Sequence, residues 1–344
     1  MTVVVAGIGL VSPRGMTPAE HVFQLRADVR VAAQPAFLHG EEKLRVGYCP
    51  WLGARLPLEE RLGAMAGRAA VSALEPLASA RARGGAVRVE AMACVSAARP
   101  DLPEAVADRA VKDALAPLKL RATMVRGAAA FFQAIGAAEA RLAQDAQAVL
   151  LLAVDSFVSE ASLAEIVARG PSPWSRVPPR PSEGAAALVL MEERTARALG
   201  VEPLATVVHA ATLSGAASDD NDAPVDGAAM TKLLFGVSGA PIVAAYGQNG
   251  VDALRSTEWH VATARARERF SMTYERVCLE DEAGALGAAA GAAGLSLGIA
   301  AAQHRALARE TDPEGLLLAW AISRDGLRGL AAVSVPAGGR RAHG

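Results

Sequence analysis

The stretch Arg121–Leu142, RATMVRGAAAFFQAIGAAEARL, decides the fold that we predict for this chain. Its pattern indicates a strand, a sharp turn at Gly127 and an alanine-rich helix with one buried face. That face is formed by Phe132, Ile135, Ala138 and Leu142. Folds display a nucleophile at strand-to-helix turns of this kind, because the helix N-terminus stabilises a developing negative charge. Here the turn carries three alanines, Ala128 to Ala130, so a nucleophile site is predicted without its nucleophile.

The composition of the 344 residues bounds the class of protein. Its 35 basic and 36 acidic side chains are interspersed and give a formal charge of −1, so we expect no nucleic-acid partner. Cys49, Cys94 and Cys278 are too few and too scattered for a disulfide framework, and the histidines lack metal-ligand spacing. The N-terminal segment lacks the charged start and the cleavage site of a signal peptide. We therefore expect a cytoplasmic protein that binds neither a metal ion nor another cofactor.

One segment, Ala283–Gln303, is long enough to span a bilayer and carries no charged residue. It consists mostly of alanine and glycine, which drive membrane insertion weakly, and no basic cluster flanks it. Its glycines at 287 and 291, and at 294 and 298, have the small-xxx-small spacing that lets helices approach closely. We therefore predict a helix buried in the protein core rather than a membrane span.

The rest of the chain alternates buried strands with helices. Strands are predicted at Val3–Leu10, Val87–Ser96, Ala148–Ser156, Glu183–Glu192, Leu204–Leu213, Pro241–Gly247, Leu316–Ser323 and Leu330–Val335. Helices are predicted at Glu59–Ala80, Asp101–Leu118 and Val225–Phe235. This alternation predicts an α/β fold with largely parallel sheets covered on both faces. Residues 1–200 and 201–344 each begin with a strand and end with a strand pair, so we predict two pseudo-duplicated halves of one compact unit.

Four stretches together resemble the β-ketoacyl synthase family of the thiolase fold. They are VVVAGIGLVSPRG from Val3, SEGAAALVLME from Ser182, SDDNDAPVDGAAM from Ser218 and GALGAAAGAAG from Gly284. They are similar to the family's opening strand, its Gly-Glu-Gly-Ala strand, its Asp/Pro/Gly loop and its glycine-rich helix start. The stretches occur in the family's order and span most of the chain. The resemblance implies a thiolase-like fold with layers in the order α-β-α-β-α.

The family's chemistry needs a cysteine that a thioester acylates and two histidines that stabilise the enolate left by decarboxylation. By the resemblance, the cysteine position falls on Ala128, eight residues before Gly136. The first histidine position falls on Tyr246 and the second on Gly284, three residues before Gly287. A lysine that usually precedes the second histidine by five residues falls on Leu279. Catalytic residues that act as a unit cannot all be replaced while activity is retained, so these substitutions predict a non-catalytic protein.

Other residues leave alternatives open. Cys94 lies in an apolar run and Cys278 beside three carboxylates, so neither is expected to replace the nucleophile. Tyr246 is interpreted either as a hydrogen-bond donor or as a ring that fills the space of the histidine. A candidate pocket comprises Phe131, Phe132, Tyr246, Asn249 and Asp252, in which the two phenylalanines either pack the core or plug a former acyl pocket.

The resemblance also implies partners. Family members are usually two-fold dimers joined through a strand beside the nucleophile helix. In polyketide systems, a catalytic chain often pairs with a homologue that lacks the cysteine, called a chain-length factor. We therefore expect this chain to be a chain-length-factor-type partner of an active ketosynthase in fatty-acid or polyketide assembly, or to form a homodimer. Acyl carrier protein is expected as a further partner. The alternatives are a scaffold protein without acyl substrate and a thioester enzyme with relocated chemistry around Tyr246, Asn249 and Asp252.

Overall fold

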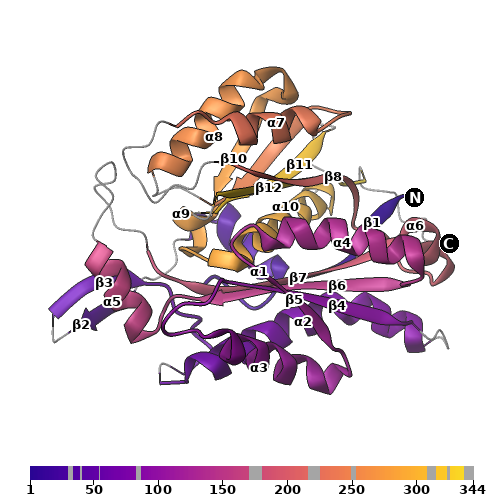
Figure 1. Ribbon diagram of the computed structural model, residues 1–344. Coiled ribbons are helices and arrows are strands. Elements are labelled where there is room, and N and C mark those ends of the chain that lie inside the picture. Colours follow the sequence, from indigo (N-terminus) through magenta and orange to yellow (C-terminus); the bar gives the residue numbers. More distant parts are fainter. Residues whose placement is uncertain are drawn as a thin grey trace.

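The computed structural model (Figure 1) describes residues 1–29, 34–38, 41–53, 55–82, 87–169, 180–215, 225–248, 253–307, 315–323 and 326–336. Ten strands are connected in the order β10-β9-β11-β12-β8-β1-β7-β6-β4-β5. Their bounds are β1 Val3–Val11, β4 Val89–Val95, β5 Ala122–Arg126, β6 Ala148–Ser156, β7 Glu183–Glu192, β8 Ala205–Ser214, β9 Ile242–Gly247, β10 Phe270–Cys278, β11 Leu316–Ile322 and β12 Leu327–Ser334. A separate pair is formed by β2 (Gln34–Leu38) and β3 (Glu41–Val46).

The strand order repeats. The first set in chain order is β1, β4, β5, β6 and β7, and the second is β8 to β12. In both sets the strands lie in the order third, second, fourth, fifth, first. The directions also agree, because the second strand is parallel to the third and fourth while the fifth is antiparallel to its neighbours. The two sets are joined where Val4 and Val5 of β1 pair with Thr206 and Ala205 of β8. The predicted division into 1–200 and 201–344 as two halves of one unit stays a prediction.

The alternation of side chains along the strands produces the layers. In β6, Val149, Leu151 and Ala153 face a central apolar cluster, whereas the intervening residues face a second cluster on the other side of the sheet. The central cluster includes α4 (Ala130–Gln144) and α10 (Ala290–Leu307). The second cluster includes α2 (Leu58–Ala82) and α3 (Glu104–Leu115), and a third includes α7 (Ala228–Gly236) and α8 (Ala253–Arg265).

Figure 1 shows these layers directly. The helices α2 and α3 cover one face of the first strand set, and α4 and α10 lie between the two sets. The helices α7 and α8 cover the outer face of the second set. The order of layers is therefore α-β-α-β-α, which confirms the predicted thiolase-like α/β fold. The prediction of largely parallel sheets is wrong, because β7 and β12 are each antiparallel to both of their neighbours and β1 is antiparallel to β8.

The alanine-rich segment is buried, as predicted. Residues 290–302 of α10 are all buried in the central layer. Across the described ranges, no helix is long and apolar enough to cross a membrane. The predicted single helix over Ala283–Gln303 is nevertheless wrong at its start, because α9 (Leu279–Ala283) ends at Gly284, whose φ of 83° is left-handed. A short 3₁₀ turn over Gly287–Ala289 then leads into α10.

The remaining helices connect the layers. They are α1 (Pro18–Arg26), α5 (Glu160–Arg169) and α6 (Glu193–Ala198). Thr17 caps α1, since its hydroxyl accepts a hydrogen bond from the backbone N–H of Glu20 at 3.3 Å, and Pro18 occupies the first helical position.

Candidate functional site

The strand-to-helix turn lies where the sequence predicts it. β5 ends at Arg126, Gly127 adopts a φ of 115°, and α4 begins at Ala130. The backbone N–H of Gly127 donates to the carbonyl of Val95 at 2.9 Å, which ties the turn to the end of β4. Ala128 is half-buried in this turn and offers only a methyl group. The turn therefore has the form of a nucleophile site, and an alanine stands where the resemblance assigns the cysteine.

Tyr246, at the first histidine position, lies near the end of β9 and is 1% exposed. Its ring packs on α10, where a Cβ at Gly298 would lie 2.8 Å from Cε2 of the tyrosine. A Cβ at Gly294 would lie 3.2 Å from the tyrosine Cβ. These two glycines, one helical turn apart, make the room that the ring occupies. Tyr246 is thus part of the central core.

Gly284, at the second histidine position, has a backbone that excludes a side chain. Its φ is 83°, and a Cβ there would lie 2.6 Å from Cβ of Ser182 and 2.9 Å from the carbonyl oxygen of Arg180. The Ser182 hydroxyl donates to the carbonyl oxygen of Ala283 at 2.6 Å, so the residue before β7 is held directly against this glycine. A histidine at 284 would require the backbone to move. The backbone at Gly284 therefore leaves no room for the histidine that the resemblance assigns to this position.

Leu279, at the lysine position, is the first residue of α9 and is 3% exposed. A Cβ at Gly294 would lie 3.3 Å from its Cδ1, so Leu279 and Tyr246 meet at the same glycine. Gly291, one turn earlier, faces Phe132 and Phe131, with carbon atoms 2.9 and 3.2 Å from its Cβ position. The structure therefore brings Tyr246, Leu279, Phe131 and Phe132 together along one glycine stripe of α10. Gly284 lies apart, against the start of β7.

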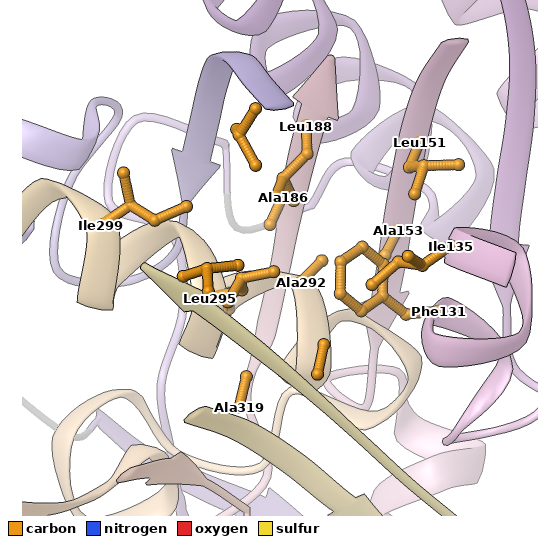
Figure 2. Close-up of a cluster of buried hydrophobic side chains, with 14 of the residues drawn as sticks. Phe131, Ile135, Leu151, Ala153, Ala186, Leu188, Ala292, Leu295, Ile299 and Ala319 are labelled. Carbon is orange, nitrogen blue, oxygen red and sulfur yellow. The ribbon is translucent and has the colours of Figure 1, made fainter. Parts of the chain in front are cut away.

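This glycine stripe serves a different contact from the one predicted. The small-xxx-small spacing predicts close helix–helix packing, whereas Gly291, Gly294 and Gly298 receive aromatic rings and a leucine. Figure 2 shows Phe131 beside Ala292 and Leu295 of α10, with Leu151, Ala153, Ala186 and Leu188 of the first strand set around them. Phe131 and Phe132 are 0% and 1% exposed, and their rings meet edge to face at 5.4 Å. The region between the substituted positions is filled by close packing.

The three cysteines are poor nucleophiles. Complete burial raises the pKa of the Cys94 thiol to about 12, and Cys94 lies in β4 as predicted. Burial also raises the pKa of Cys278 to about 12, with Asp281 and Glu280 contributing less. The sequence predicts the neighbouring carboxylates as the cause of the raised pKa of Cys278, whereas in the structure the larger cause is burial of the thiol. Burial and the nearby Glu183 carboxylate raise the pKa of Cys49. Thiolate is the reactive form, so a raised pKa disfavours each of these thiols as a nucleophile.

A polar network that the sequence did not predict lies at the carboxyl ends of β4 and β6. Asp155 is fully buried and accepts hydrogen bonds from Nη1 of Arg99 and from the backbone N–H of Ala288, both at 2.9 Å. Gly287, with a φ of 53°, leaves the space that the Asp155 carboxylate occupies. Arg99 also binds Asp101 at 2.9 Å. The network ties the turn before α10 to the first strand set, and its charges are paired.

Glu183, the glutamate of the Gly-Glu-Gly-Ala-like strand, is also engaged internally. Its carboxylate is fully buried and forms a bidentate ion pair with Arg61 of α2. It accepts a further hydrogen bond from the backbone N–H of Cys49 at 2.7 Å. Glu183 thus links β7 to the outer helical layer. Asn249 and Asp252, the other two residues of the predicted pocket, lie outside the described residues.

Among the residues that the structure describes, no three His, Cys, Asp or Glu side chains lie close enough to hold a metal ion. A shallow hollow of about 570 Å³ lies between α2 and α3, where Glu59, Glu60 and Asp113 line it with small residues. This hollow belongs to the outer layer and is remote from the central layer that holds α4 and α10.

Comparison with known proteins identifies the fold. No protein-family model and no curated protein matches the chain. Among solved structures, the ishigamide ketosynthase/chain length factor matches with a TM-score of 0.74 and 20% identity, covering 97% of this chain and 99% of that one. A type II PKS acyl-carrier protein complex with its ketosynthase, AntDE:AntF, matches at 0.78 and 16%, with the same coverage.

The ketosynthase from module 6 of the bacillaene synthase of Bacillus subtilis 168 matches with a TM-score of 0.75 and 13% identity. The match covers 97% of this chain and 72% of that one. At these identities the likeness establishes the fold, so the chain has the ketosynthase fold that its motifs predict.

Proposed function

We propose that this chain is a non-catalytic ketosynthase-fold protein that serves as a chain-length-factor-type partner of an active ketosynthase in acyl-chain assembly. One observation carries the proposal. The positions that the resemblance assigns to the nucleophile and both histidines hold Ala128, Tyr246 and Gly284, and at Gly284 the surrounding backbone leaves no room for a side chain. A coordinated loss of this kind is expected of a fold retained for a purpose other than condensation.

The edge strand β5 supports a partner. It ends the strand order, and Thr123 is exposed while its other four residues are half-buried. An edge strand presents backbone N–H and C=O groups to a second strand, and β5 leads directly into the turn at Ala128. A partner strand paired there would lie beside the vacated site. We therefore assign the dimer contact to β5, with a cysteine-bearing ketosynthase or a second copy of this chain as the partner.

The solved structures that this chain resembles are consistent with a partner of this kind. One is a ketosynthase/chain length factor, and another is a ketosynthase in complex with an acyl-carrier protein. We extend both to this chain as proposals, with an acyl carrier protein as a further partner. The cysteine usage supports a reducing cytoplasm as the compartment.

The test is co-expression of the tagged chain with the cysteine-bearing ketosynthase that the proposal expects to be encoded beside it. Light scattering after size exclusion should report a stable one-to-one complex. Thr123→Pro should abolish the complex, because proline removes a backbone donor from β5. The matched control is Thr273→Pro on β10, the edge strand at the opposite end of the strand order, which should leave the complex intact. Recovery of homodimer alone, with no binding of acyl carrier protein, would overturn the proposal.

A second candidate function is a scaffold without acyl substrate. It is favoured by the close packing of Phe131, Phe132 and Tyr246, which fills the region between α4 and α10. The two candidate functions predict different effects on the length of the partner's product. If the chain shapes an acyl tunnel with its partner, replacing Phe131 or Phe132 by alanine changes the length of the partner's product. A scaffold leaves the product unchanged. Relocated chemistry around Tyr246 would instead require thioester hydrolysis by the purified chain alone.

A further inference from the structure

Two arginines from distant parts of the sequence hold the short helix α9. Arg14 lies in the turn after β1, and its Nε donates to the carbonyl oxygen of Glu282 at 2.7 Å. Its Nη2 forms an ion pair with the carboxylate of Glu282. Arg180 lies just before β7, and its Nη2 donates to the carbonyl oxygen of Asp281 at 3.1 Å. The two guanidinium groups therefore bind neighbouring carbonyl groups of one short segment.

In the described part of the chain, each of these arginines keeps a buried N–H group without an acceptor. Arg14 is 4% exposed, and its Nη1 has no hydrogen-bond partner within the described ranges. Arg180 is half-buried, and within the same ranges its Nε likewise has none. A buried donor without an acceptor is destabilising, and more so when it belongs to a charged group. The pair therefore offers two hydrogen-bond donors to an acceptor from outside this chain.

The positive charge of Arg180 is incompletely balanced. Burial and the nearby Arg14 guanidinium lower the pKa of Arg180, and the carboxylates of Asp281 and Glu282 raise it by less. A lowered pKa means that the surroundings disfavour the charged form of an arginine. Arginine nevertheless stays protonated in proteins. Glu282 is already paired with Arg14, and Asp281 is exposed. An added anion would therefore compensate a charge that the neighbouring residues stabilise poorly.

The turn that carries Arg14 holds this arginine in place. Ser12 and Gly15 exchange two backbone hydrogen bonds of 3.0 Å. The Ser12 hydroxyl accepts a hydrogen bond from the backbone N–H of Arg14 at 3.1 Å and lies 2.8 Å from Nε2 of His21 in α1. A cation that is already fixed loses little conformational freedom on binding, which favours affinity. Arg180, which is half-buried, gives the pair its contact with solvent.

We propose that Arg14 and Arg180 form a binding site for one oxyanion, which is a phosphate or carboxylate group of a small ligand. The oxyanion would accept hydrogen bonds from Nη1 of Arg14 and from the guanidinium group of Arg180, which turns toward it. Guanidinium groups recognise both kinds of anion through planar, charge-assisted hydrogen bonds. The carbonyl oxygen of Arg180 lies 2.9 Å from the Cβ position of Gly284, so the site lies beside the glycine that the resemblance assigns to the second histidine.

This oxyanion site is independent of the proposed function. It rests on contacts within one chain, next to β1 and β7, whereas the partner contact is assigned to β5 at the end of the strand order. A chain that pairs with no ketosynthase can still bind the oxyanion, and a chain that binds no oxyanion can still pair through β5. The two experiments therefore fail separately.

The test is isothermal titration calorimetry of the full chain with inorganic phosphate and, separately, with malonate, while sodium chloride keeps the ionic strength constant. At least one of the two anions should bind with a dissociation constant on the order of 1 mM, as expected for a few charge-assisted hydrogen bonds. Tighter binding of phosphate would identify a phosphate ester as the ligand class, and tighter binding of malonate a carboxylate. Arg180→Met should weaken the binding by at least about tenfold.

Thermal unfolding separates this role from a purely structural one. The preferred anion should raise the melting temperature of the parent chain above its value in chloride, because it binds only the folded state. Arg180→Met should abolish this anion-dependent rise, whatever its effect on the melting temperature in chloride. The matched control is Arg88→Met, which removes an exposed arginine that pairs with Asp145 at 2.9 Å and should leave the rise unchanged.

Arg14 requires a double variant, because Arg14→Met alone would leave Glu282 without its ion-pair partner. Arg14→Met combined with Glu282→Gln should also lose the anion-dependent rise. Absence of binding by both anions, or a rise that persists in Arg180→Met, would overturn the proposal. A rise that is lost equally in Arg88→Met would overturn it as well, since the effect would then belong to general surface charge.

Discussion

Truncation of Phe131 tests the packing of the vacated site most sharply. The side chain is fully buried in the central layer, between α4 and the glycine stripe of α10. Figure 2 shows its ring pointing toward Ala292, with Ile135 and Ala153 beside it. Phe131→Ala removes the ring and leaves a void that rigid neighbours on both strand sets cannot close. The comparison variant is Phe23→Ala on α1, where the ring is 68% exposed.

The expected loss follows from the burial. A buried phenylalanine replaced by alanine costs about 3–5 kcal/mol, which includes the transfer of the ring and the cavity that remains. The edge-to-face contact with Phe132 at 5.4 Å is lost as well, and such contacts contribute about 0.5–1.5 kcal/mol beyond area burial. We therefore expect Phe131→Ala to lower the free energy of unfolding by an amount in the upper part of this range. Phe23→Ala should change the free energy of unfolding by less than about 0.5 kcal/mol.

The assay is urea denaturation followed by circular dichroism, with the two variants and the parent chain measured together. The midpoint should fall for Phe131→Ala while the slope stays constant, because a change in stability alone moves the midpoint. The cavity should also take up benzene or xenon, as apolar cavities of this kind do. A loss below about 1 kcal/mol, or a loss equal to that of Phe23→Ala, would refute the close packing between α4 and α10.

Three further predictions concern other buried elements. Burial lowers the pKa of His21 from 6.5 to about 4. The free energy of unfolding should therefore be highest above pH 6.5 and fall by up to about 3 kcal/mol as the pH is lowered toward 4, because the unfolded chain binds the proton more readily. His21→Gln should flatten this dependence in urea titrations. Gly298→Ala should destabilise the protein by about 1–3 kcal/mol, because the added methyl group would overpack the ring of Tyr246. Gly136→Ala, in open space on α4, should stabilise the protein by up to about 1 kcal/mol in the same assay. Glu258→Gln should cost about 3–5 kcal/mol by breaking the buried ion pair between Glu258 and Arg328, and melting curves should show partial recovery when Arg328→Met is added; no recovery would contradict the pairing.

The sequence predicts the buried strands well, because their apolar runs carry the signal. Ala148–Ser156 and Glu183–Glu192 are predicted with the bounds that β6 and β7 have in the structure. Both strands are covered by helices on both faces, so nearly every residue is apolar and the run stands out. The strand-to-helix turn at Gly127 is predicted for a similar reason, since the spacing of Phe132, Ile135 and Ala138 marks the buried face of α4.

Exposed elements escape the same reasoning. β10 was not predicted, because it is an edge strand whose residues at 272, 273 and 275 face solvent and interrupt any apolar alternation. The predicted elements also lack α8, β2 and β3. Elements of this kind form through tertiary contacts that local propensity does not encode.

The contacts within the candidate site escape prediction for another reason. The ion pair between Arg99 and Asp155 joins residues 56 positions apart, and no periodicity links them. The glycines of α10 are visible in the sequence, but the rings that they receive come from α4 and β9. Their partners become known only when the layers are assembled. The assignment of the catalytic positions from motifs stays a prediction, whereas the packing around Tyr246, Leu279 and Phe131 is seen only in the structure.

The central claim is that this chain keeps the ketosynthase fold without its condensing chemistry. The most direct test is intact mass spectrometry of the purified chain after incubation with acyl and malonyl thioesters, beside an active ketosynthase under the same conditions. The account predicts an unmodified chain and no condensation product, because Ala128 offers no nucleophile and burial holds the pKa of all three cysteine thiols above the usual range. An acyl adduct on the chain, together with a condensed product that it alone forms, would contradict the claim.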